Sequence, residues 1–210
     1  DDWKADNSEQ YEIKITDKSY EHPTTGAVYE NVVTNTDPVT TTIKDNTTDK
    51  PNNPSTIENN QENVILKIVA VGENGEPIIK DGKYTFANEV AEGSNAKYMV
   101  LAFKPDTTEF KVTDKLDIQS GTVEVKTFDK DATGTTTQTK EDGTQDYVSK
   151  TQKVELGKVI SVETLDDWKA DNSEQYEIKI TDKSYEHPTT GAVYENVVTN
   201  TDPVTTTIKD

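Results

Sequence analysis

The densest group of side chains that could do chemistry is a run of carboxylates that occurs twice. The run consists of Asp166, Asp167, Asp171 and Glu174, and it recurs with the same spacing as Asp1, Asp2, Asp6 and Glu9. Carboxylates this close together repel one another unless a cation lies among them. Ca²⁺ is the hard cation that suits carboxylate oxygens, and it takes about six to eight of them. The run therefore predicts either half of a Ca²⁺ site or a solvated acidic loop.

Two other carboxylate motifs are weaker. Asp129-Lys-Asp131-Ala-Thr-Gly134 has part of a calcium-loop spacing, but it lacks the closing bidentate glutamate. Asp146 lies in a predicted turn, where an aspartate more often accepts hydrogen bonds from backbone amides than it binds metal.

Residues suited to catalysis are few. His22 and His187 occupy the same repeated position beside a proline, so each is interpreted as a surface histidine. The sequence contains no nucleophile elbow, zinc-protease motif or phosphate-binding glycine loop. Trp3 and Trp168 follow the paired aspartates, where packing over the loop is favoured over sugar stacking. We therefore expect a protein that is not an enzyme.

A repeat organises the whole chain. Residues 1–45 recur letter for letter as residues 166–210, an offset of 165 positions, which is the size of a domain. Residues 46–63 contain Pro51, Pro54 and almost no apolar side chain, as expected of an extended linker. We therefore predict the C-terminal part of an upstream repeat at 1–45, a linker at 46–63 and a complete repeat at 64–210.

Composition limits the partners. The chain has 40 acidic and 22 basic residues, a net charge of −18, and all of its basic residues are lysine. Nucleic-acid binding requires a basic surface, and an anionic membrane would repel this protein. There is no cysteine and no apolar run of the roughly 18 residues that span a membrane. We expect no nucleic-acid partner, no membrane insertion and an extracellular location.

Apolar residues alternate with polar ones along most of the chain, which predicts half-buried strands. In Val64–Val71 the side chains of Val64, Leu66, Ile68 and Ala70 share one face. Turn residues, such as those of Gly72–Gly75 and Lys80–Gly82, separate the strands. The predicted strands are Val64–Val71, Lys83–Ala87, Lys97–Phe103, Gly121–Phe128, Thr151–Leu156, Lys158–Thr164, Gln175–Thr181, Val193–Val198 and Pro203–Lys209. Many short strands and no helical pattern predict an all-β sandwich.

An ordered set of motifs in residues 90–210 resembles the Calx-β domain and the related extender repeats of giant RTX-type bacterial surface adhesins. The motifs are Val90-Ala-Glu92-Gly93, Asp142-Gly-Thr-Gln-Asp146-Tyr147, Asp166-Asp167, Glu174, Tyr176, Tyr194-Glu-Asn-Val197 and Thr205-Thr-Thr-Ile-Lys-Asp210. The chain departs from the family at Asp171, at Ser173 and in longer connections at 104–120 and 128–141. Residues 64–87 lie outside the resemblance.

The resemblance implies an antiparallel Greek-key sandwich of immunoglobulin-like or Calx-β-like type that binds structural Ca²⁺. The ligands that it implies are Glu92, Asp166, Asp167 and Glu174, with Asp171 as a further candidate. It also places Asp210, and Asp45 of the upstream copy, at a junction between repeats, where each could cap an ion.

Together these features predict a non-catalytic extender of a large secreted adhesin. It would form a Ca²⁺-stiffened rod with neighbouring identical repeats and project a distal binding domain that attaches to a host or surface ligand. The alternative is a β-sandwich module that itself binds a glycan or a protein.

Overall fold

The computed structural model describes residues 9–17, 19–43, 63–105, 107–137, 144–166, 173–190, 194 and 196–209. Residues 9–43 belong to one compact unit and residues 63–209 to another, and each unit is described by itself. Of the predicted linker 46–63, only Asn63 is among the described residues, and it is the first residue of a strand. No helix in the described ranges is long and apolar enough to cross a membrane.

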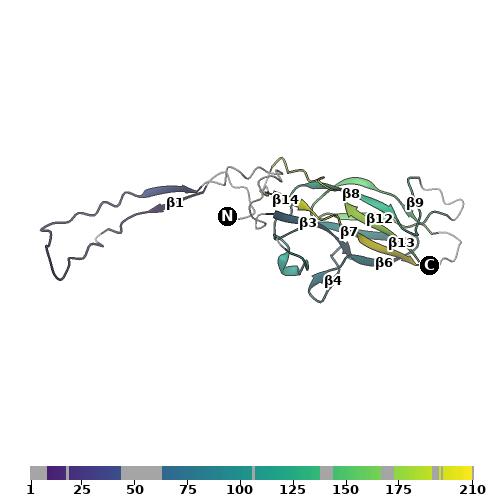
Figure 1. Cartoon of the computed structure of the whole chain (residues 1–210), viewed down its shortest axis with the longest axis horizontal. Coiled ribbons are helices and arrows are strands. Elements are labelled where there is room, and N and C mark those ends of the chain that lie inside the picture. The colour runs from purple at the N-terminus through teal and green to yellow at the C-terminus, as the bar shows by residue number, and fades with distance from the viewer. Residues whose placement is uncertain are drawn as a thin grey trace. The chain divides into compact units, whose positions relative to one another are not determined.

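The larger unit consists of two sheets that face each other (Figure 1). One sheet has the strand order β11 (Thr151–Glu155), β8 (Thr122–Asp129), β13 (Glu174–Ile180), β15 (Val204–Lys209), β6 (Ala87–Ala91). The other has the order β12 (Val159–Glu163), β7 (Asn95–Phe103), β3 (Asn63–Val71), β14 (Asn196–Thr199). This arrangement confirms the predicted β-sandwich.

Alternation along the strands explains the core between the sheets. The predicted inward face of β3, which includes Leu66 and Ile68, has no solvent exposure. From the opposite sheet, Tyr176, Ile178 and Ile180 of β13 are equally buried. Because neighbouring residues of a strand point to opposite faces, one register buries the whole apolar set of that strand.

The sandwich is mainly antiparallel, as predicted, but each of its two sheets also contains one parallel pair. β14 runs parallel to β3, and β15 runs parallel to β6. The reason is that the chain crosses from one sheet to the other between β14 and β15. Each of these late strands therefore lies beside an early strand that has the same direction. A third parallel pair, β9 (Gly134–Thr135) with β10 (Tyr147–Val148), is a two-residue ladder.

The predicted strand Lys83–Ala87 is divided in the structure. Its first part, β5 (Lys83–Tyr84), forms a hairpin with β4 (Ile79–Lys80) around Asp81 and Gly82. Both turn residues have positive φ, 52° and 74°, as a two-residue Asp-Gly turn requires. Thr85 then bonds to the backbone of Ala70 and Ile78, and β6 begins at Ala87 in the other sheet.

A second apolar cluster covers the outer face of β3 and β7. It consists of Val69, Tyr84, Leu101, Phe103 and Phe110. The connection between β7 and β8, which includes the short 3₁₀ helix η2 (Val112–Asp114), brings Phe110 against Phe103 with ring centroids 5.1 Å apart. Both faces of β3 are therefore buried. This fits its sequence, in which apolar and polar residues alternate only in part.

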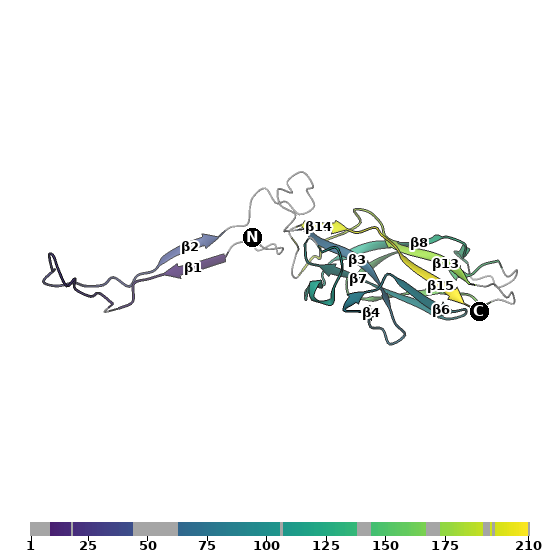
Figure 2. The same cartoon turned by 60° about the horizontal axis from the view of Figure 1, so that its bottom comes forward.

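The first and last described residues of the sandwich lie at opposite ends. Asn63 begins β3 beside Asn196 of β14. Lys209 ends β15 beside Ala91 of β6, and the Glu92 N–H donates to the carbonyl of Lys209. Figure 2 shows these two ends of the sandwich separated by the length of the strands.

The smaller unit contains a hairpin of β1 (Glu9–Ile13) and β2 (Val39–Ile43). Its register, from Glu9 opposite Ile43 to Ile13 opposite Val39, is that of β13 and β15 shifted by the repeat offset. Burial differs completely, since Ile13 is 64% exposed and its counterpart Ile178 is fully buried.

Candidate functional site

Carboxylates gather at the end of the sandwich where β15 finishes. We call this region the acidic end and define it by Glu92, Asp129, Asp131, Glu163, Asp166 and Glu174. The turn between β6 and β7, the ends of β8 and β12 and the start of β13 bring these residues to the same end of the two sheets. Strand connectivity therefore assembles a set of carboxylates that the sequence spreads over more than eighty positions.

The turn between β6 and β7 is tied firmly to the end of β12. The N–H of Thr164 donates to the carbonyl of Ser94 at 2.9 Å, and the Thr164 hydroxyl accepts from the N–H of Ser94 at 3.1 Å. Gly93 has a φ of 68°, and a Cβ placed there would lie 3.0 Å from the Cβ of Asp166. A glycine is needed here because Asp166 lies directly over it. The turn therefore places Asp166, a predicted Ca²⁺ ligand, against the residue that follows Glu92, another predicted ligand.

Glu174 lies farther along the same end. It begins β13 opposite Ile208 of β15, and Ile208 lies opposite Val90 of β6. Two strand spacings of about 4.8 Å therefore separate its backbone from the strand that leads to Glu92. Within the described residues, no three Asp, Glu, His or Cys side chains converge to hold a metal ion. The other predicted ligands of this repeat, Asp167, Asp171 and Asp210, lie outside the described residues.

In the upstream copy, only Glu9 of the predicted ligands is described. It is exposed and pairs with Ile43, as Glu174 pairs with Ile208. Asp1, Asp2, Asp6 and Asp45 lie outside the described residues, as do Trp3 and Trp168.

Asp129 and Asp131 of the acidic end, together with Asp146, accept hydrogen bonds from backbone amides. Oδ2 of Asp146 accepts from the N–H of Thr133 at 2.6 Å, which confirms the prediction that this residue holds a backbone amide. Oδ1 of Asp131 accepts from the N–H of Gln175 at 2.6 Å, and Oδ1 of Asp129 accepts from the N–H of Gly134 at 3.0 Å. Charged acceptors make the stronger class of hydrogen bond, and the Asp131 contact ties the loop after β8 to β13.

A buried chain of hydroxyls crosses the core beneath this end. The Tyr98 hydroxyl bonds to the hydroxyl of Tyr176 at 2.6 Å, and it also bonds to Thr206, which donates to Oδ1 of Asn88 at 2.6 Å. Burial raises the pKa of Tyr176 to about 12. These groups stay neutral and join the two sheets. The sequence analysis does not predict these linked hydroxyl groups, although a tyrosine at an inward position of a strand requires a partner for its hydroxyl.

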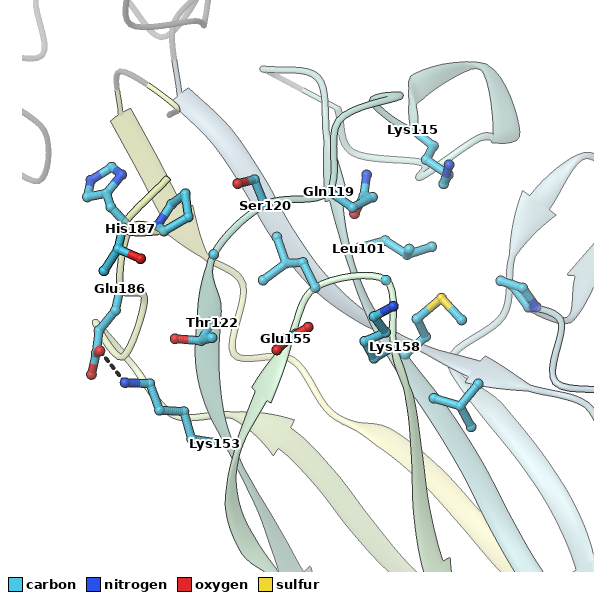
Figure 3. A pocket seen from close by; sticks show the side chains of 18 of the residues that line it. Leu101, Lys115, Gln119, Ser120, Thr122, Lys153, Glu155, Lys158, Glu186 and His187 are labelled. Atoms are coloured by element: carbon cyan, nitrogen blue, oxygen red, sulfur yellow. Dashed lines mark hydrogen bonds and ion pairs between the residues drawn. The ribbon is translucent and has the colours of Figure 1, made fainter. Parts of the chain in front are cut away.

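The opposite end of the sandwich carries an open groove of about 1150 Å³ (Figure 3). Leu101, Thr122 and Glu155 line it, and Lys153 and Glu186 form an ion pair at its edge. Its lining among the described residues includes no Trp, Tyr or Phe. His187 at this groove is half-buried and packs edge-on against Tyr185, with ring centroids 5.0 Å apart. The interpretation as a simple surface histidine therefore fits only its exposed counterpart His22.

Comparisons with known proteins identify no family for this chain. No family model matches the sequence, and no curated protein matches it. Among solved structures, the chain is similar to one titled "Crystal structure of Apo-form Calx CBD1 domain". The identity is 16% and the TM-score 0.37, over 71% of this chain and 98% of the other.

Proposed function

We propose that this chain is a non-catalytic spacer from a large secreted adhesin, in which tandem copies form a rod stiffened by Ca²⁺. The rod would carry a distal domain that binds a host or surface ligand, and it would lie outside the cell.

The position of the two ends of the sandwich is the main support. β3 begins at one end, and β15 finishes at the other. A strand of nine residues, such as β3, spans about 30 Å. Copies joined through such ends extend a chain with each addition, whereas ends on the same side would fold it back. The exact recurrence of 45 residues is consistent with a spacer, because the length of a spacer is set by how many copies of the repeat it contains.

The acidic end supports the role of Ca²⁺. Asp166 lies against Gly93, and the neighbouring Glu92 bonds through its N–H to Lys209 where β15 finishes; the next copy would follow from there. Carboxylates with carbonyl oxygens are the donor set that Ca²⁺ prefers. Glu92 and Asp166 would hold the ion together with Asp167 and Glu174, and neutralising these charges would fix the junction.

Rod formation can be measured with chains of one, two and three complete repeats. Small-angle scattering in millimolar Ca²⁺ should show a maximum dimension that grows by a constant increment with each repeat. A chelator should shorten that increment, because like charges at each junction are then no longer bridged. A dimension that stays nearly constant as repeats are added would contradict the spacer.

The metal is tested separately by thermal unfolding of the 210-residue chain. A ligand that binds only the folded state at a hundredfold excess over its Kd stabilises it by about 2.7 kcal/mol. We expect Ca²⁺ to raise the Tm, and Asp167→Ala to remove most of this rise without unfolding the protein in chelator. Asp117→Ala changes an exposed aspartate away from the acidic end and serves as the control. Equal melting temperatures with and without Ca²⁺ would eliminate the metal from the proposal.

The alternative function, a module that binds a glycan or a protein, has the groove of Figure 3 in its favour. Its polar rim and open form could accept an extended ligand. The described lining holds no Trp, Tyr or Phe ring of the kind that usually stacks on sugars, so the groove suits a peptide better than a glycan. A Thr122→Trp variant that fills the groove should abolish such binding and leave rod length unchanged.

A further inference from the structure

A lysine is buried beneath the connection between β7 and β8. Lys67 of β3 is 2% exposed, and its Nζ lies 4.8 Å from the ring centroid of Phe86 and 5.8 Å from that of Phe110. An ammonium group is costly to bury unless it is paired. Burial lowers the pKa of Lys67 to about 8, and the Asp202 carboxylate opposes only part of this change. The neutral amine, which can act as a nucleophile, is therefore more accessible near physiological pH than that of an exposed lysine.

The Lys67 amine contacts the side-chain amide of Asn200, which follows β14, and the backbone of Asp202. Nζ lies 2.8 Å from Oδ1 of Asn200 and 2.8 Å from the backbone oxygen of Asp202. Because the C=O bond is about 1.2 Å long, Nζ lies within about 4 Å of the amide carbon. The N–H of Asn200 donates to the carbonyl of Leu66 at 2.8 Å, so the two residues are held together through the backbone as well.

We propose that Lys67 and Asn200 form an intramolecular isopeptide bond once the sandwich has folded. The neutral Nζ attacks Cγ of Asn200 and forms a C–N bond, while the C–N bond to the amide nitrogen breaks. Nζ loses a proton, the departing NH₂ group gains one, and ammonia leaves. The product is a secondary amide between the two side chains, and no oxidant, reductant or cofactor takes part.

Two groups around the amide suit this reaction. Oδ1 of Asn200 accepts from the N–H of Asp202 at 2.9 Å. A donor already aimed at the oxygen where negative charge develops lowers the barrier to acyl transfer. Oδ2 of Asp202 lies 3.8 Å from Nζ, where it can take the proton from nitrogen and pass it to the leaving group. The Asp202 side chain is 80% exposed, so ammonia has a path to water.

The bond would join the first strand of the sandwich to the segment just before its last strand. Tension applied at Asn63 and Lys209 would pass from Lys67 to Asn200, and residues 68–199 would carry none of it. This consequence rests on the proposed spacer function, whereas the bond itself does not.

The repeat supplies an internal control. Asn35 occupies the position of Asn200 in the upstream copy and makes the same turn, with its Oδ1 accepting from the N–H of Asp37 at 2.8 Å. Asn35 is exposed, whereas Asn200 faces the buried amine. A reaction that depends on Lys67 therefore modifies Asn200 only. Spontaneous cyclisation of the asparagine, which also releases ammonia, would affect both.

The test is mass spectrometry of the purified 210-residue chain after denaturation. We expect a mass about 17 Da below that of the sequence, the loss of one ammonia. Trypsin should yield residues 45–80 joined to residues 184–209, because a modified Lys67 is not cleaved. Peptides 19–44 and 184–209 are identical, so the unlinked peptide should fall to half of its amount. Lys67→Arg and Asn200→Ala should each restore the full mass.

Recovery of Lys67 and Asn200 in separate peptides from folded wild-type protein at full mass would overturn the proposal. A loss of ammonia that persists in Lys67→Arg, or that maps equally to Asn35, would overturn it too. The wild-type measurement needs no variant to fold. Asp202→Ala should slow the appearance of the lighter species, and an unchanged rate would remove Asp202 from the reaction.

Discussion

The two copies of the repeated segment allow one substitution to be made in two environments. Ile178 in β13 is fully buried between the sheets, and Ile13 in β1 is the same residue of the same sequence at 64% exposure. Ile178→Ala should cost about 2–5 kcal/mol, because it removes buried carbon atoms and leaves a cavity. Ile13→Ala removes little buried area and should change the free energy of unfolding by less than about 0.5 kcal/mol.

Chemical denaturation of the 210-residue chain, followed by fluorescence, measures both variants on the same scale. For a domain of this size, each kcal/mol shifts the Tm by about 2–4 °C, so Ile178→Ala should melt roughly 10 °C below wild type. The denaturant dependence should be similar in both variants, since the surface exposed on unfolding changes little. If Ile13→Ala destabilises the sandwich as much as Ile178→Ala, the two copies exchange places within it, and the assignment of β13 to residues 174–180 fails.

Three further predictions concern single features. Burial lowers the pKa of His187 below its usual value of 6.5, so the free energy of unfolding should fall as the pH drops below about 6.5. Unfolding measured at pH 7.5 and at pH 5.5 should show this fall. His187→Gln should reduce the difference between the two pH values, and His22→Gln should leave it unchanged. Tyr98→Phe should cost about 1–3 kcal/mol in denaturation, because it leaves the Tyr176 hydroxyl without its partner in the core, and a neutral result would show that the hydroxyl chain is dispensable. The 210-residue chain should associate in light scattering while residues 46–210 stay monomeric, because Tyr11, Ile13 and Ile15 are exposed; monodisperse behaviour of both would show that these side chains do not drive association.

Residue alternation was sufficient to predict most strands. β3, β7, β8, β11, β12, β13 and β15 lie within one or two residues of the predicted ranges. Each has inward side chains that form a period-two set, and burying that set fixes the register. β9 and β10 were not predicted, because a two-residue parallel ladder has no periodicity to detect.

The burial of Lys67 could not be predicted, because the alternation of β3 places this residue on the face that water would cover. Phe110 and its neighbours in the connection after β7 cover that face instead. The contact with Asn200 depends on β14 lying beside β3, which is a pairing of residues far apart in the sequence. The carboxylates of the acidic end were easier to predict in part, since Asp166 and Glu174 are close in sequence. The place of Glu92 followed from the resemblance and not from the pattern of the residues.

The repeated segment separates what its own sequence determines from what its surroundings determine. Both copies adopt the same five-pair register and the same asparagine turn, and each packs a tyrosine edge-on against a histidine with centroids 5.0 Å apart. Burial differs, as does strand β14, whose counterpart at 31–34 is not a strand, and both differences come from contacts with residues 63–165. In the proposed array, residues 63–165 of one copy could pack with the segment equivalent to 166–210 of any copy, so sequence alone would not select the partner. Proximity selects it instead. Residues 166–210 follow residues 63–165 directly, whereas residues 1–45 are separated from residues 63–165 by residues 46–62. A shorter connection raises the effective concentration of the local partner, and an array of identical repeats can thus pair correctly without any difference between its copies.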